Sequence, residues 1–159
     1  MSERFAPDVA AALTAAGWTP GRAVDEQPAV DYVHGEIGRD GARTEAHDAA
    51  LAALREFTGL TVIQDGPGVD LRRRPFVIDP VPIAASTETL ADFGAVLGDR
   101  LFPIGMEGDH DSIIAMASSG HVFALDHAGE WHLGDSMDEA LAMLVTGTQP
   151  PRVDDNGRW

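Results

Sequence analysis

The sequence predicts one folded domain that combines amphipathic helices with short strands that follow one another in the chain. Its 159 residues are 44% hydrophobic and 23% charged, which is ordinary for a globular protein and sufficient for a core. Residues 101–133 contain short apolar runs separated by tight turns, a pattern typical of neighbouring strands. Residues 136–147 then read as an amphipathic helix that begins with a capping signal. These three observations favour a mixed fold of helices and strands.

Four segments have the apolar spacing of a helix. They begin at Pro7, Thr44, Thr87 and Ser136 and end at Gly17, Gly59, Gly98 and Gly147. The starting residues suit an N-cap or a first turn, and the glycines suit a helix end, with a left-handed exit expected at Gly59. The predicted buried faces are Val9, Leu13 and Ala16; Ala50, Leu54 and Phe57; Leu90, Phe93 and Leu97; and Met137, Ala140, Leu141 and Leu144. Ser136 and Glu139 are expected to form a reciprocal capping box.

The predicted strands lie between these helices. They are residues 32–33 (a weak strand), 60–63 with 71–78 as a hairpin partner, 101–104, 112–117, 122–125 and 130–133. Both alternating faces of residues 112–117 are apolar, which predicts a strand at the centre of the sheet. We expect a single domain over residues 1–147, followed by a loosely ordered tail over residues 148–159.

Acidic residues far outnumber basic ones. Eleven arginines face 26 acidic residues, lysine is absent, and the net charge is −15. The excess is largest in residues 81–159, which carry three arginines against 13 acidic residues. Such a surface repels nucleic acid and anionic membranes and attracts a basic macromolecule. We therefore expect no binding to nucleic acid or membrane, while solubility alone also explains the charge.

Two further features bear on location. Cysteine is absent, which excludes a disulfide framework and a thiolate metal site. The first residues include Glu3 and Asp8 and lack an uninterrupted apolar run, so they are predicted to be neither a signal peptide nor a membrane span. A cytoplasmic location fits both features.

One short run resembles part of a metal-dependent hydrolase site. His110-Asp111, with Asp109 beside it, supplies metal-ligating side chain types. A metal needs three or more convergent ligands, however, and this run lies in a loop that leads into a strand. We interpret it as a solvated acidic loop and keep a small metal-dependent hydrolase as an alternative.

The remaining histidines and the common catalytic motifs also point away from catalysis. His121, His127 and His132 match no known ligand spacing and are interpreted as surface or turn residues. A nucleophile elbow and a lysine-containing phosphate-binding loop are both absent from the sequence. We therefore predict a binding protein rather than an enzyme, without a metal or a cofactor.

The arginines and tryptophans have structural interpretations. Residues 72–74 are three consecutive arginines, interpreted as edge-strand residues that form ion pairs with the acidic excess. Arg22 is expected to pair with a carboxylate near Trp18, which is predicted to be buried. Trp131 fits either a buried position or an interface anchor.

Several short motifs follow one another along nearly the whole chain. They are Gly17-Trp18, Pro20-Gly21-Arg22, Leu54 and Phe57 before Gly59-Leu60, Asp79-Pro80, residues 101–105, residues 120–123, and Gly134 before Ala140-Leu141 and Gly147. Their order resembles the SUKH immunity-protein superfamily, specifically its third branch. The resemblance implies an α+β fold with a central, mainly antiparallel sheet flanked by helices. It also implies a bacterial protein that is not an enzyme and that neutralises a toxin by occluding the toxin's active site.

The resemblance carries no catalytic residues across, and its toxin contacts vary with the toxin. Trp18, Arg22, Pro80, Pro103, Gly105 and Gly134 are therefore interpreted as fold determinants. From the charge we hypothesise a basic, nucleic-acid-targeting toxin that meets the acidic loops of the second half. The hypothesised contacts are Glu107, Asp109, Asp111, Asp126, Glu130, Trp131 and Asp135. A regulatory protein-binding scaffold of the same fold is the alternative.

Overall fold

A six-stranded antiparallel sheet forms the centre of the described chain, residues 3–38, 41–109 and 111–159 of this computed structural model. The strands are β1 (Thr61–Val62), β2 (Phe76–Val77), β3 (Leu101–Glu107), β4 (Ser112–Ala117), β5 (Val122–Asp126) and β6 (Gly129–Gly134). Each strand pairs with the next one in the sequence. The expected α+β fold with an antiparallel sheet is confirmed, and β4 is an interior strand buried on both faces.

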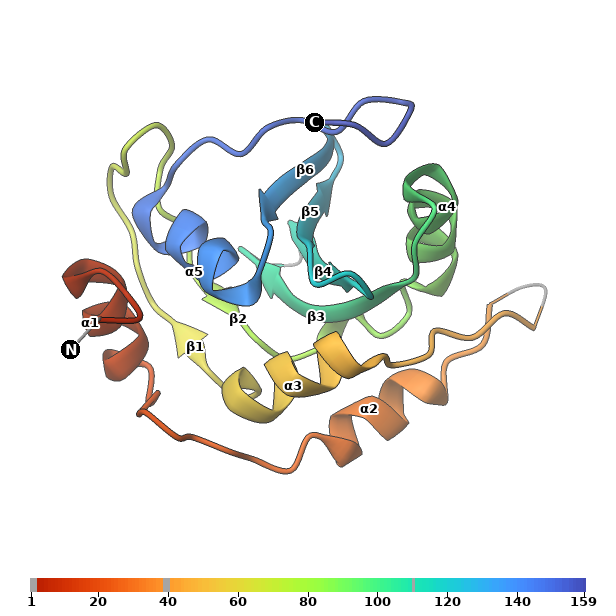
Figure 1. The fold of residues 1–159 in the computed structure, drawn as a ribbon, viewed down its shortest axis with the longest axis horizontal. Helices are drawn as coiled ribbons and strands as arrows, with labels where there is room; N and C mark the ends of the chain where they lie inside the picture. Colours follow the sequence, from red (N-terminus) through yellow and green to blue (C-terminus); the bar gives the residue numbers. More distant parts are fainter. Residues whose placement is uncertain (1–2, 39–40, 110) are drawn as a thin grey trace.

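Helices cover both faces of this sheet. They are α1 (Pro7–Ala15), α2 (Gln27–His34), α3 (Asp48–Phe57), α4 (Thr87–Leu97) and α5 (Met137–Thr146), with a short 3-10 helix, η1, at Val81–Ile83. The helices α4 and α5 lie on opposite sides of the sheet (Figure 1). Within the described residues, no helix combines the length and the apolar character needed to cross a membrane.

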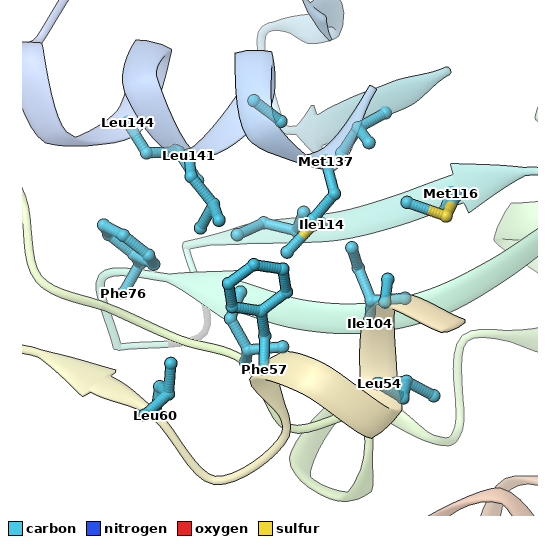
Figure 2. Close-up of a cluster of buried hydrophobic side chains, with 14 of the residues drawn as sticks. Leu54, Phe57, Leu60, Phe76, Ile104, Ile114, Met116, Met137, Leu141 and Leu144 are labelled. Atoms are coloured by element: carbon cyan, nitrogen blue, oxygen red, sulfur yellow. The ribbon is translucent and has the colours of Figure 1, made fainter. Parts of the chain in front are cut away.

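Two hydrophobic cores form, one on each face of the sheet. On the larger side, Leu141 of α5 points toward Phe57 of α3 (Figure 2), and both side chains are almost fully buried. Burial of one such side chain contributes about 1.5–3 kcal/mol to folding. On the other side, Phe93 of α4 meets Phe123 of β5 edge to face, with ring centroids 5.3 Å apart. The sheet is therefore covered on both sides.

Strand register decides which side chains share a face. Ile114, Ala124 and Trp131 are cross-strand partners and belong to the α5 side. Phe123 and His132 form the next pair and belong to the α4 side. Successive residues alternate between faces, so this register separates the functional candidates of the last strands into two groups.

The expected strand at residues 32–33 is wrong, because these residues lie in α2. Pro28 occupies the first turn of this helix, where its missing amide costs nothing. Val30 and Val33, three positions apart, are both buried, whereas Tyr32 is exposed. Helical spacing of the two valines thus outweighs the strand preference of a β-branched and aromatic pair.

The helix starts differ from expectation at two places. Thr44 is not the cap of α3: the N-cap is His47, whose ring accepts a hydrogen bond from the Ala50 amide at 3.2 Å. Thr87 is the first residue of α4 rather than its cap, and its hydroxyl lies 3.3 Å from that of Thr44. Both threonines are buried and join the loop before α3 to the start of α4.

The helix ends and the α5 start agree better with the sequence. The helices α4 and α5 end at Gly98 and Gly147, as predicted, and both glycines take left-handed C-cap conformations. Ser136 accepts from the Glu139 amide at 3.3 Å, but the Glu139 carboxylate accepts from the amide of Asp135 at 2.7 Å rather than from Ser136. The capping box is therefore only half formed, and its second bond secures the turn before the helix.

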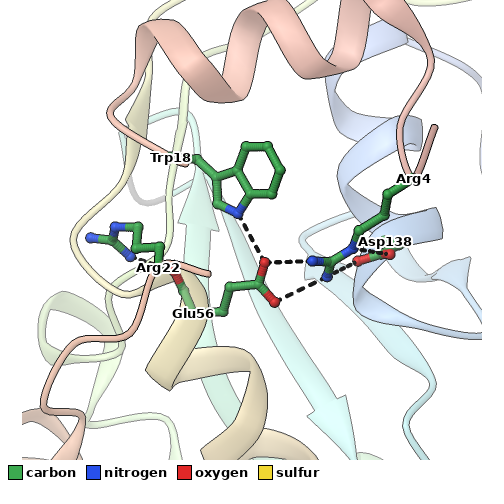
Figure 3. A network of polar contacts seen from close by, with 5 residues as sticks. All are labelled: Arg4, Trp18, Arg22, Glu56 and Asp138. Atoms are coloured by element: carbon green, nitrogen blue, oxygen red, sulfur yellow. Dashed lines mark hydrogen bonds and ion pairs between the residues drawn. The ribbon is translucent and has the colours of Figure 1, made fainter. Parts of the chain in front are cut away.

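A polar network joins the first residues to two helices (Figure 3). Trp18 is buried, as predicted, and its indole donates to the Glu56 carboxylate at 2.9 Å. The same carboxylate accepts two bonds from Arg4, and Arg4 donates two more to Asp138 of α5. This arginine thus ties the chain before α1 to both α3 and α5.

The expected pairing of Arg22 with a carboxylate is wrong. Its guanidinium donates to the backbone carbonyls of Glu56 and Thr58, at 2.5 and 2.8 Å. Arg4 and Trp18 already occupy the nearby carboxylate, and the last carbonyls of α3 remain as acceptors at the negative end of the helix dipole. Arg22 therefore caps the C-terminus of α3.

The glycines interpreted as fold determinants lie where a side chain does not fit. A Cβ on Gly105 would lie 2.2 Å from the Val77 carbonyl oxygen, and one on Gly134 would lie 2.6 Å from the Cβ of Glu139. The register of β3 shifts between Pro103 and Gly105. These positions allow β2 to approach β3, and α5 to approach β6, at backbone distance.

Residues 148–159 run along the outer edge of β6. The His132 amide donates to the Pro151 carbonyl and the Val153 amide to the Glu130 carbonyl, both at 2.9 Å. Val153 is buried in the α4-side core. The segment covers backbone groups that an edge strand otherwise leaves unpaired. The sequence pattern, which predicted a loose tail, does not indicate these contacts.

Candidate functional site

A groove of about 340 Å³ lies on the α5 side of the sheet, between the chain before β2, the ends of β3 and β5, and the C-terminus of α5. Its apolar wall includes Leu71, Trp131 and Met143. Two carboxylates, Glu107 and Asp126, also line it. The groove therefore combines an apolar wall with acidic groups, a combination that suits a long cationic side chain.

Three of the seven hypothesised contact residues meet in this groove. Glu107 ends β3 opposite Ser112 of β4, and Asp126 ends β5 near the same end of the sheet. Trp131 lies on the same face of β6, and its indole donates to Asp126 Oδ1 at 3.2 Å. That oxygen also accepts from the amides of the β5–β6 turn, so the Asp126 carboxylate is held in place.

Glu107 is the least satisfied carboxylate of the groove. Its side chain is 20% exposed, and burial raises its pKa above the ordinary value of 4.5. The neighbouring charges of Asp126 and Asp111 raise the pKa further, while Arg74 lowers it. Arg74 is 4.0 Å from Glu107 and forms its closer ion pair with Asp111. An additional cation in the groove would relieve this excess of negative charge.

Two of the three consecutive arginines form ion pairs, as predicted. Arg72 pairs with Asp65 at 2.6 Å, and Arg74 with Asp111. Arg73 donates to the backbone carbonyl of Asp65 at 2.7 Å. They do not lie in an edge strand, however, because β2 begins only at Phe76. They instead brace the loop that forms one wall of the groove.

The other hypothesised contacts do not join one face. Asp111 does not line the groove but forms an ion pair with Arg74, which does. Asp109 is exposed in the β3–β4 turn. Glu130 pairs with Leu125 on the α4 side of the sheet. Asp135 lies beyond β6, next to two histidines. His110 lies outside the described residues, so the considered His110-Asp111 dyad has no described geometry.

Two histidines, which the sequence predicts to be separate surface or turn residues, come together. His121 Nδ1 lies 2.9 Å from His132 Nε2, and Asp135 Oδ1 lies 3.2 and 3.3 Å from these atoms. His132 is only 7% exposed, so its interpretation as a surface or turn residue is wrong. The sequence signal for this contact is a β-hairpin whose turn lies at residues 126–129. Pairing the two strands from that turn places both histidines at the same end of one face.

Comparison with known proteins gives one finding. A family model described as SUKH-3 immunity protein matches residues 5–147. A search of curated proteins gave no match, and a search of solved structures gave none either. The matched segment contains the whole described sheet, all five labelled α-helices and most of the groove-lining residues.

Proposed function

Because the chain belongs to the SUKH-3 immunity protein family, we propose that it binds a cognate bacterial toxin and neutralises it by occluding the toxin's active site. The family supports an immunity role that requires a protein partner rather than a chemical reaction. The proposed partner is basic and targets nucleic acid, and the proposed location is the cytoplasm. The strongly acidic composition supports the choice of a basic partner.

The proposed contact surface is the groove around Glu107, Asp126 and Trp131. The observation that carries this choice is Glu107, a largely buried carboxylate whose pKa is raised although Arg74 lies 4.0 Å away. An arginine or lysine of the toxin would bond this carboxylate and lay its aliphatic stem along Leu71 and Trp131. A nucleic-acid-cleaving site presents such cations to phosphate, so the groove's carboxylates would take the place of phosphate oxygens.

Growth rescue tests the proposed function. Toxin domains encoded in the same genome are each produced in a bacterial host with and without this chain. We expect the chain to restore growth against one toxin and to elute with it as a stable complex in gel filtration. Failure to rescue growth against any of them, with the chain soluble and folded in every culture, would contradict the proposed function.

A further inference from the structure

A second cluster of polar groups lies outside the groove, on the opposite face of the sheet. His121 precedes β5, His132 lies in β6, and Asp135 lies in the turn that leads into α5. One ring nitrogen from each histidine and one carboxylate oxygen lie within 4.8 Å of one another. The three groups therefore converge from three separate segments.

The spacing of these atoms matches the ligand set of a small divalent ion. Their separations are 2.9, 3.2 and 3.3 Å. Bonds of about 2.0–2.1 Å in a tetrahedral zinc site place neighbouring ligand atoms about 3.3 Å apart. An ion at equal distance from all three atoms thus needs little movement of the side chains. Imidazole and carboxylate are also ligand types that suit zinc.

Hydrogen bonding alone satisfies this arrangement poorly. A neutral imidazole carries a proton on only one of its two nitrogens, and an ionised carboxylate carries none. If one histidine donates to the other, the accepting nitrogen directs its lone pair at the proton, and Asp135 Oδ1 faces that nitrogen without a proton between them. A cation at the centre of the triangle satisfies all three lone pairs at once.

The surroundings hold the three side chains in this position. The ring of Trp159 stacks on His132 with centroids 4.4 Å apart, and Phe123 meets the same imidazole edge to face. The Asp135 amide donates to Glu139, which secures the turn. The Asp135 side chain is 67% exposed, so one side of the cluster is open to water. Fixed ligands with one open side are typical of a three-ligand metal site.

We propose that His121, His132 and Asp135 bind one zinc-class divalent ion, with water at the fourth position. Such an ion joins the β5–β6 hairpin to the turn that leads into α5. Because the folded chain alone provides this geometry, binding stabilises the fold. This site is separate from the groove, so its test is independent of the proposed toxin binding.

Zinc titration of chelator-stripped protein, followed by calorimetry in excess magnesium, tests this proposal. Magnesium occupies the many exposed carboxylates, whereas imidazole ligands favour zinc. We expect one saturable zinc site per chain and a higher melting temperature. Asp135→Ala, at an exposed side chain, is expected to weaken binding by more than about 100-fold, since even supporting groups around a metal contribute about 10–100-fold. His132→Gln should have the same effect.

His127→Gln is the matched control, because this histidine is exposed in the β5–β6 turn. It should bind zinc as the wild-type chain does, and circular dichroism confirms that each variant is folded. Cobalt(II) in place of zinc should give the intense visible bands of a tetrahedral complex in the wild-type chain and not in Asp135→Ala. Absence of a saturable site, or equal binding by Asp135→Ala and His127→Gln, overturns the proposal.

Discussion

At the scale of single residues, His47 is a helix cap that works only when it is uncharged. Its Nε2 lies 2.9 Å from the Met116 carbonyl, which can only accept, so this nitrogen carries the proton. Its Nδ1 accepts from the Ala50 amide and must therefore remain unprotonated. Burial lowers the pKa of His47 below the ordinary 6.5. Protonation at Nδ1 would break the cap and place a charge inside the protein.

His47 therefore predicts part of the acid sensitivity of the fold. The unfolded chain takes up the proton near pH 6.5, whereas the folded chain resists it. The stability that His47 contributes is complete above this pH and declines as the pH falls toward the lower folded-state pKa. In urea unfolding between pH 7.5 and 5, His47→Gln should lose less stability than the wild-type chain. Equal losses would contradict this role.

Glu107 predicts opposite effects on stability and on binding. Its raised pKa means that folding disfavours its ionised form, so the charge lowers stability above the folded-state pKa. Glu107→Gln should therefore match or exceed the wild-type stability at pH 7, and the difference should shrink as the pH falls toward 4.5. The same substitution should weaken toxin binding. Chemical unfolding and binding of the same samples provide the check; a variant that is clearly less stable at pH 7 would refute this view of Glu107.

At the scale of elements, Arg4 holds α3 and α5 together through four hydrogen bonds. Its side chain is partly exposed, which weakens the ion pairs by solvent screening. Arg4→Ala should lower the free energy of unfolding by about 1–2 kcal/mol, the range of charge-assisted hydrogen bonds after this discount. Arg4→Lys should recover only part of the loss, because lysine lacks the planar fork. Full recovery by lysine would show that charge alone matters.

The segment after α5 predicts a stability effect that a loose tail would not have. Val153→Ala removes two buried methyl groups from the α4-side core and should cost about 2 kcal/mol. Asp155→Ala, at an exposed position in the same segment, is the control and should be nearly neutral. Thermal unfolding of both variants decides the matter. A neutral Val153→Ala would mean that the segment does not pack on the sheet.

Local signals in the sequence predicted most elements, because glycine exits and apolar spacing act over a few residues. The α5 helix and the buried β4 strand follow from such signals alone. The cap of α3 does not follow from local sequence, because a tertiary contact with the Met116 carbonyl fixes the tautomer that lets His47 accept from Ala50. Residues 32–33 join a helix instead of the predicted strand, because the burial of Val30 together with Val33 outweighs their strand propensity.

At the scale of the whole molecule, long-range register decides what the sequence could not show. The sequence indicated an acidic second half, but the register divides its carboxylates between two faces of the sheet. Glu107 and Asp126 meet in the groove, whereas Asp135 joins the two histidines on the other side. The groups that meet in each cluster are far apart in the chain, or are separated by a turn whose length the sequence does not specify. The candidate site was therefore predictable in charge and only partly in position.

The central claim is that the groove carboxylates bind a cationic site of the toxin. The most direct test measures binding to the toxin identified by growth rescue, by stopped-flow kinetics and at equilibrium, over a salt series. It compares Glu107→Gln/Asp126→Asn with the matched pair Glu45→Gln/Asp92→Asn, which removes equal charge from exposed positions near α4. We expect association to slow with salt for every protein, and the groove pair alone to weaken affinity by about tenfold or more, chiefly through faster dissociation. Equal effects of the two pairs, or an association rate independent of salt, would contradict the claim.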